Sequence, residues 1–232
     1  INEIKDINDK KEKLNSLKAN FEFLPDSKGI NKLLNKINLF GKIELEKNYQ
    51  IDSKIINKEE EIELLAKRLT SNGLQNKKVT FSLLYRASRD GDDPNIYHKK
   101  CDGKANTICL IETIKGCKFG GYTEVMINSA GSDYKDPNSF VFSINKLKIY
   151  ENMKKEKNAI CHSSNWGPIF RSDAFAVWNE KFFSYNKHRV GTKGQSNFGN
   201  MDKDYEINNG EQYFSIKELE VFQIIIDKNK IK

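Results

Sequence analysis

The residues whose types most clearly suggest catalysis are Cys161 and His162. A cysteine nucleophile is commonly activated by a histidine that acts as its base. Neighbouring side chains of a strand point to opposite faces, however, so adjacent residues rarely pair in this way. His98 and His188 lie elsewhere in the sequence, and no spacing rule places an Asp or Asn to orient these rings. The sequence therefore argues against a cysteine hydrolase, and we predict no catalytic residue and no enzymatic activity.

The thiols suggest a second chemistry, redox sensing, which requires a cysteine of lowered pKa. The candidate is Cys101-Asp102, where the cations of Lys99 and Lys100 would favour a thiolate. Cys101 ends a predicted helix, however, where the helix dipole disfavours negative charge, and it shares the apolar face of that helix with Tyr97. We therefore expect a buried structural thiol, with a redox sensor or antioxidant enzyme as the alternative.

Neither a metal nor a cofactor is expected. No two of the four cysteines have CxxC spacing, and the three histidines do not complete a zinc pattern. The pair Gly120-Gly121 lacks the Lys-Ser/Thr and the helix that follow phosphate-binding glycines. Glycines in a strand more often permit a bulge or a close contact within the sheet, and we expect that role here.

The segment Ser88-Arg89-Asp90-Gly91 combines a cation with residues that form turns. Ser and Asp oxygens accept backbone N–H bonds, and glycine permits a positive φ. We expect a turn at the end of a strand, closed by an internal salt bridge from Arg89 to a carboxylate such as Asp102 or Glu124. The alternative is an Arg-centred surface for a partner.

The charge pattern limits the partners. The net charge is +7, but arginine, the main reader of DNA bases, is scarce, so we predict no nucleic-acid binding. A basic run comprises Lys146, Lys148, Lys154, Lys155 and Lys157. We favour a solvated loop for this run, with weak contact to an anionic membrane surface or an acidic partner as the alternative. Without an apolar run of about 18 residues or a secretory segment, we predict a cytoplasmic protein with no transmembrane segment.

The elements that position these residues fall into two parts. Residues 1–76 read as a helical, coiled-coil-like arm: apolar positions recur every seven residues in 1–24, and a breaker follows at 25–29. An apolar stripe then continues to Leu69, with a helix over 51–69, and Gly73 follows as a stop. So narrow a stripe must pack on the first helix, on the C-terminal domain or on another chain. We expect an antiparallel hairpin first and self-association through this arm second.

Residues 77–232 change to short β-branched and aromatic runs separated by Gly, Asn and Asp. The predicted strands cover 79–87, 107–114, 119–127, 140–144, 147–150, 175–178 and 215–226. One helix is predicted here, with Asp93 as its cap and Pro94 in its first turn. The fold class is therefore α+β: a two-layer antiparallel β-sandwich with a few short helices, preceded by the helical arm.

An ordered series of motifs in this second part resembles the TLDc domain. The series comprises LLYRASRDG at 83–91, Cys101-Asp102-Gly103-Lys104, Phe119-Gly120-Gly121-Tyr122, Ser139-Phe140-Val141-Phe142-Ser143 and Leu219-Glu220-Val221-Phe222. The resemblance spans about 77–226, and proteins that join a coiled coil to such a domain occur in protists. Arg171-Ser172-Asp173 stands where the family usually has a glycine-rich stretch.

The resemblance implies a β-sandwich without a catalytic centre, linked to oxidation resistance and to binding of the vacuolar proton-pumping ATPase. It also implies a structural or partner-binding role for the motif residues, which are Ser88, Arg89, Asp90, Gly91, Cys101, Asp102, Gly120, Gly121 and Glu220. We therefore expect a non-catalytic protein-interaction module. A third hypothesis is a structural oligomer built through the arm.

Overall fold

The computed structural model describes residues 49–71, 78–155, 157–171, 174–178, 181–192, 197–199 and 201–226. These residues belong to one compact unit, Asn48–Lys232. The coiled-coil heptads predicted in 1–24, the turn at 25–29 and the apolar stripe up to residue 48 lie outside the described residues.

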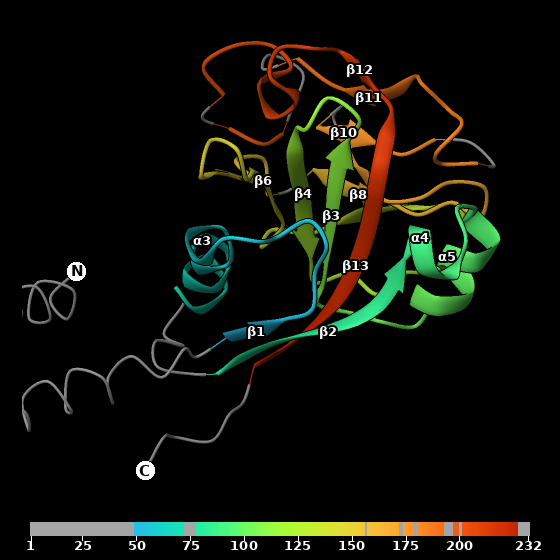
Figure 1. Ribbon diagram of the computed structural model, residues 1–232, viewed down its shortest axis with the longest axis horizontal. Coiled ribbons are helices and arrows are strands. Elements are labelled where there is room, and N and C mark those ends of the chain that lie inside the picture. The colour runs from blue at the N-terminus through green and yellow to red at the C-terminus, as the bar shows by residue number, and fades with distance from the viewer. Residues whose placement is uncertain are drawn as a thin grey trace, which may run out of the picture. The chain divides into compact units, whose positions relative to one another are not determined.

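The first of two β-sheets has seven strands (Figure 1). In spatial order they are β1 (Tyr49–Ile51), β2 (Val79–Arg86), β13 (Ile216–Ile226), β3 (Thr107–Thr113), β4 (Lys118–Thr123), β6 (Phe140–Ser143) and β7 (Lys148–Glu151). All neighbouring strands are antiparallel except β1 and β2, which pair in parallel with Tyr49 opposite Val79. The long strand β13 lies between β2 and β3, and this brings the two ends of the domain sequence together.

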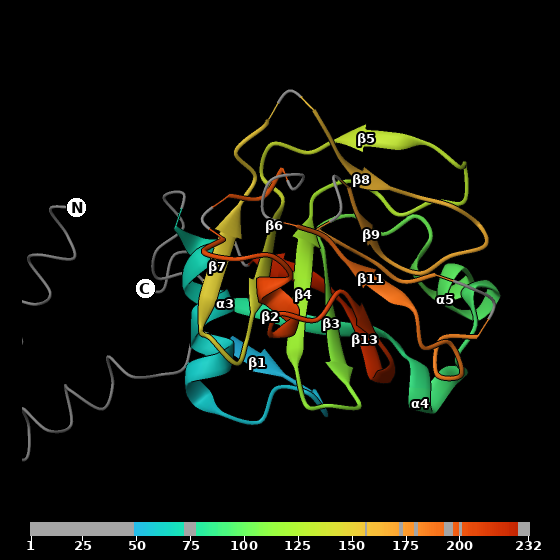
Figure 2. The same cartoon turned by 90° about the horizontal axis from the view of Figure 1, so that it is seen from above.

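The second sheet has six shorter strands and lies along one face of the first (Figure 2). Its order is β12 (Tyr213–Phe214), β11 (His188–Val190), β10 (Phe175–Ala176), β9 (Ile169–Phe170), β8 (Asn158–Cys161) and β5 (Asp133–Lys135). All of its pairs are antiparallel. The predicted two-layer sandwich is therefore confirmed, with β1 as a parallel addition.

An aromatic core joins the two sheets. Phe119 on β4 meets Phe175 on β10 and Phe214 on β12, with ring centroids 5.6 and 5.1 Å apart, both edge to face. Phe170 on β9 stacks on Phe175 at 4.9 Å. Such offset and edge-to-face pairs add to the stabilisation from burying the rings, so this contact fixes how the sheets face each other.

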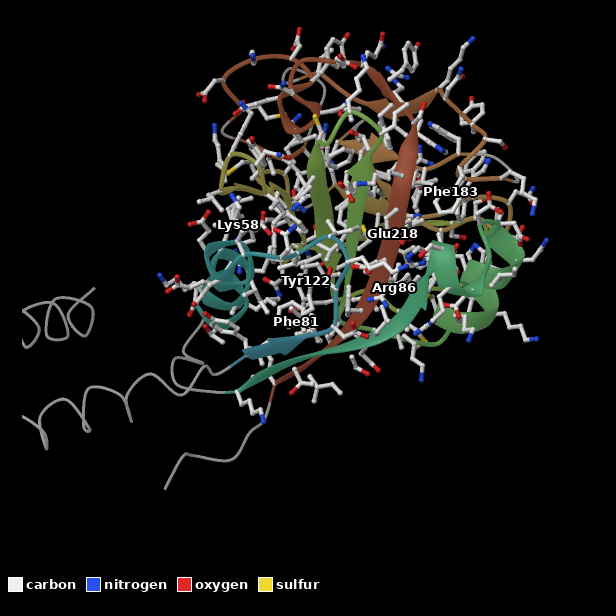
Figure 3. The ribbon with its side chains drawn as sticks, viewed as in Figure 1. Lys58, Phe81, Arg86, Tyr122, Phe183 and Glu218 are labelled. Carbon is white, nitrogen blue, oxygen red and sulfur yellow. The ribbon has the colours of Figure 1, made fainter. Side chains whose placement is uncertain are left out.

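A second apolar layer covers the outer face of the seven-stranded sheet. It is formed by α3 (Glu59–Thr70), whose Leu65 is fully buried in a cluster with Phe81 of β2 and Tyr122 of β4 (Figure 3). The Glu61 carboxylate accepts the Lys58 backbone N–H at 3.1 Å and so caps the first turn. The helix in this region is confirmed, and within the described residues its apolar stripe packs on the seven-stranded sheet.

The segment before α3 differs from the predicted helix over 51–69. Tyr49–Ile51 is strand β1, and the Ser53 hydroxyl then accepts the backbone N–H groups of Ile55 and Ile56 at 3.0 and 2.9 Å. Such local bonds compete with helix formation. Strand β1 and helix α3 belong to the compact unit that starts at Asn48, on the N-terminal side of the boundary expected at 76/77.

Three short helices complete the fold: α4 (Ala87–Asp90), α5 (Pro94–Cys101) and the 3-10 turn η1 (Glu206–Asn208). The predicted cap of α5 is confirmed, since Asp93 Oδ1 accepts the Ile96 N–H at 3.1 Å. A hairpin at Lys115-Gly116 joins β3 to β4, and Gly116 has φ +80°.

Candidate functional site

Several of the motif residues gather where β2 ends beside β13. Arg86 closes β2, α4 carries Ser88 to Asp90, and β13 contributes Glu218 and Glu220 (Figure 3). Alternation along β13 sends the two glutamates to the same face, and both are buried, with 5 % and 0 % exposure. Buried carboxylates are rare without partners, so their contacts define the site.

The side chain of Glu220 accepts hydrogen bonds from three donors. Its oxygens accept bonds from Arg86 Nε at 2.6 Å, Ser53 Oγ at 2.5 Å and the Lys54 backbone N–H at 3.0 Å. Two of these donors come from the segment that follows β1, far from Glu220 in sequence. The buried charge is therefore paired and saturated with hydrogen bonds, which is the condition for keeping an ion pair inside a protein.

The guanidinium of Arg86 reaches a second partner on the same segment. Its Nη2 donates to the Asp52 carbonyl oxygen at 2.7 Å, with the Asp52 carboxylate at 3.4 Å. Burial opposes the charge of Arg86, but the bond to Glu220 and the nearby Asp52 outweigh it, so the pKa of Arg86 is raised. Arg86 is thus a permanent cation that clamps residues 52–54 to the sheet.

Ser88 and Glu218 form the outer part of this site. The Ser88 backbone N–H donates to Glu218 at 3.1 Å, and the Ser88 hydroxyl lies 2.9 Å from Lys54 Nζ. Lys54 Nζ is also 4.0 Å from Glu218, and its side chain is 58 % exposed. The site therefore grades from a buried pair to an exposed rim.

Arg89 makes a salt bridge with its own neighbour. It donates to Asp90 from Nη2 at 2.7 Å and from Nε at 3.0 Å. This hydrogen bond lowers the pKa of the Asp90 carboxyl to about 2, against the opposing effect of burial. Asp90 also accepts the Arg86 N–H at 3.0 Å, and Gly91 follows at φ +118°, so the segment is a closed strand-end turn.

The pairing of Arg89 with Asp102 or Glu124 was a wrong prediction. Asp102 instead lies 2.7 Å from His98 Nδ1 and accepts the Ser129 hydroxyl at 2.6 Å. Glu124 accepts the Asn138 amide at 2.9 Å. Asp90 is the next residue in sequence after Arg89, so pairing the two side chains costs little chain entropy.

His98 ties α5 to the loop after β8. Its Nε2 donates to the carbonyl oxygens of Ser163 and Trp166, at 2.8 and 3.1 Å, while Nδ1 faces Asp102. Both ring nitrogens are therefore occupied by structural contacts. This ring has no nitrogen left to act as a base for a thiol.

Cys161 and His162 do not form a nucleophile and base. Cys161 Sγ lies 3.5 Å from Arg171 Nη2 and 3.9 Å from the His162 carbonyl oxygen, and neither contact is to an imidazole ring. His162 Nδ1 is buried with no hydrogen-bond partner among the described residues. Burial, together with nearby His98, lowers the pKa of His162 to about 4. The ring is neutral at physiological pH and faces the interior.

All four cysteines are free thiols, and their surroundings favour the protonated form. Burial raises the pKa of Cys101 and of Cys161, raises that of Cys109 to about 12, and raises that of Cys117, which is only partly buried. Cys101 is fully buried at the end of α5, beside Tyr97. Such thiols are poor nucleophiles, because the thiolate is the reactive form.

The two strand glycines permit close packing. A Cβ on Gly120 would lie 1.9 Å from the Cys109 carbonyl oxygen, and one on Gly121 would lie 2.4 Å from the Phe170 ring. Both distances are shorter than atoms can approach, so β4 needs glycine to lie against β3 and β9. The geometry matches the expected close sheet contact and offers no phosphate cradle.

Sequence reasoning missed the contribution of residues 52–54 to the Glu220 site, because it placed them inside a helix. The available signal was Asp52-Ser53, two residue types that favour turns and caps over helix interiors. Glu218 was missed too, although its spacing of two from Glu220 puts both on one face of a strand.

The described part of the chain holds no group of three or more His, Cys, Asp or Glu residues placed to bind a metal ion. A cavity of about 20 Å³ lies between the sheets beside His162, which is enough for one water. Two hollows lie at the surface. One, of about 150 Å³, is lined by residues that include Ile114 and Tyr213, and the other, of about 240 Å³, by residues that include Asn95 and Lys181. None of these three hollows is lined by Arg86, Asp90 or Glu220.

Comparison with known proteins gives one family. The family model described as the TLDc domain matches residues 50–225. The match begins within β1 and so includes the segment that binds Glu220. No curated protein matches the chain. Among the described residues, none of the helices has the length and apolar character needed to cross a membrane.

Proposed function

The chain belongs to the TLDc domain family, and from this membership we propose that it acts as a non-catalytic protein-interaction module. The observation that carries the proposal is the internal pairing of the motif. The polar groups of Glu220, Arg86 and Asp90 form hydrogen bonds with one another and with residues 52–54. Such a cluster fixes the shape of the surface around it, which favours a role in binding.

The exposed rim of this cluster is the part that a partner can reach. Arg89 is 45 % exposed and Lys54 is 58 % exposed, and Ser88 lies between them at the surface. Arginine is enriched among the residues that dominate binding energy in interfaces. We place the partner-binding face at Ser88 and Arg89, because these two motif residues remain exposed at the surface.

The partner that we propose is the vacuolar proton-pumping ATPase, with a contribution to oxidation resistance, since the resemblance to the family implies both. The test is affinity capture with the full chain from lysate, under energised and de-energised conditions, with the captured proteins identified by mass spectrometry. Capture of pump subunits is the expected result. Absence of pump subunits under both conditions would reject this partner.

A matched pair of variants tests the face itself. Arg89→Gln removes the exposed cation of the motif, whereas Arg171→Gln removes a cation of the same 45 % exposure that also pairs with an aspartate, Asp133. Capture should fall at least about tenfold with the first variant, the scale of a single interface arginine, and stay unchanged with the second. Equal behaviour of the two would remove segment 88–91 from the proposed face.

The redox alternative lacks support from the thiols, since burial raises the pKa of all four. Thiol labelling near pH 6 should modify the cysteines only after denaturation. Rapid labelling of any one cysteine in the folded protein would revive this alternative.

The oligomer hypothesis concerns the arm, most of which lies outside the described residues. Its test by light scattering needs a cut at 47/48, because a cut at 76/77 would remove β1 and α3 from the sheet. A monomeric 1–47 fragment would count against self-association through the arm.

A further inference from the structure

The connection between β7 and β8 carries an exposed apolar side chain among lysines. Met153 is 64 % exposed, and Lys154, Lys155 and Lys157 are all exposed. In Figure 2 this gold connection extends outward beyond both sheets. What distinguishes this connection is that an exposed apolar side chain and three exposed lysines lie within five consecutive residues.

The structure separates Lys148 from the three lysines at the end of the basic run. Lys148 Nζ is paired with Asp202 at 2.8 Å and with Glu206 at 3.0 Å, so its charge is already neutralised. Lys154, Lys155 and Lys157 make no ion pair with any part of the chain that the structure describes. Glu156 interrupts them in sequence, which leaves a formal charge of +2 over 154–157.

The connection is held in shape by buried amides. Asn152, 3 % exposed, donates from Nδ2 to the Asp136 carbonyl oxygen at 2.8 Å and accepts the Lys154 N–H at 3.1 Å. The Met153 N–H donates to the Asn197 carbonyl oxygen at 2.9 Å, and the Lys157 N–H donates to that of Lys154 at 2.8 Å. Because the backbone is already ordered, binding through this turn loses little conformational entropy.

We propose that this turn docks on an anionic lipid surface, with the Met153 side chain entering the headgroup region and the three lysines facing lipid phosphates and carboxylates. Apolar and cationic contributions add in peripheral membrane binding. One turn is too small for a stable protein interface, which needs roughly 800 Å² from each partner. A flat, continuous, negative surface needs only a projecting tip. This inference does not depend on the proposed TLDc partner.

The test is sedimentation of the full chain with phosphatidylcholine vesicles, with and without about a third phosphatidylserine. Binding is expected on the anionic vesicles alone and should weaken as salt rises. Combined Lys154→Gln, Lys155→Gln and Lys157→Gln should weaken binding about fivefold for each lysine, and so about a hundredfold together. A dispersed control, Lys104→Gln, Lys187→Gln and Lys203→Gln, removes equal charge from exposed lysines on three other connections and should retain binding.

The apolar contribution has its own matched pair. Met153→Ser should weaken binding about fivefold, whereas Ile114→Ser, at 65 % exposure on the turn between β3 and β4, should not. Equal losses from the clustered and dispersed lysine variants would overturn the site, since net charge alone would then explain binding. Capture on immobilised polyglutamate without vesicle binding would overturn the lipid assignment in favour of an acidic protein.

Discussion

Truncating Glu220 tests the buried pair that organises the candidate site. In the variant Glu220→Ala, the guanidinium of Arg86 loses its carboxylate while its side chain is only 9 % exposed. Removing one partner of a buried ion pair typically costs about 3–5 kcal/mol, because the remaining charge stays desolvated. Ser53 Oγ and the Lys54 N–H lose their acceptor as well. We therefore expect the upper half of that range.

The pairing itself is measured by a double-mutant cycle. Arg86→Met alone should also cost about 3–5 kcal/mol, since it strands the Glu220 carboxylate. The combined variant leaves no unpaired charge, so it should cost little more than either single change. The resulting coupling energy should be about 3–4 kcal/mol, at or above the upper end of what contacting residues show.

The assay is urea unfolding of the full chain, followed by tryptophan fluorescence. The two tryptophans, Trp166 and Trp178, meet edge to face at 4.6 Å on the six-stranded sheet, away from the mutated pair. A suitable control is Glu211→Ala, which breaks the exposed pair with Lys115 and should cost less than about 1 kcal/mol. Strictly additive single costs, or a Glu220→Ala cost as small as that of the control, would refute the buried pair.

Three further predictions use the same unfolding assay. Deleting 1–47 should preserve the unfolding transition, whereas deleting 1–76 should abolish it, because the latter strips β1 and α3 from the sheet. Burial lowers the pKa of His162 and of His188 from 6.5 to about 4, so the unfolded chain binds more protons in between. As the pH falls from 6.5 to 4, the free energy of unfolding should decrease by up to about 1.4 kcal/mol per pH unit for each of the two histidines. The variant His162→Phe should make the free energy of unfolding less dependent on pH over this range. Gly121→Ala should cost about 1–3 kcal/mol through its clash with the Phe170 ring, and no loss would contradict the packing of β4.

Local chemistry made α5 and the long strands predictable. Asp93 and Pro94 specify a helix start through a side-chain cap and a preset φ, and both act within one turn of the chain. Long β-branched runs such as those of β3 and β13 likewise carry their own signal. The strands of the second sheet span only two to four residues, too few for alternation to be read.

Tertiary pairing accounts for what the sequence did not reveal. The stripe of α3 predicted an apolar face without saying which surface would cover it, and that surface proved to be the outer face of β2, β4 and β6. Glu220 was recognisable as a motif residue, but its donors lie more than 130 residues away in sequence, and no spacing rule connects them. The pairing of Arg89 failed for the opposite reason, since the nearest carboxylate was its own neighbour.

The same contacts decide where the folding unit begins. Glu220 is fully buried and takes donors from both Arg86 on β2 and residues 53–54 after β1. If the segment carrying β1 left the sheet, Glu220 would lose two of its three donors, and Arg86 would lose its bond to Asp52. A buried pair tolerates such losses poorly. Strand β1, helix α3 and the motif at the end of β2 should therefore form and melt together, as one cooperative unit that includes β1.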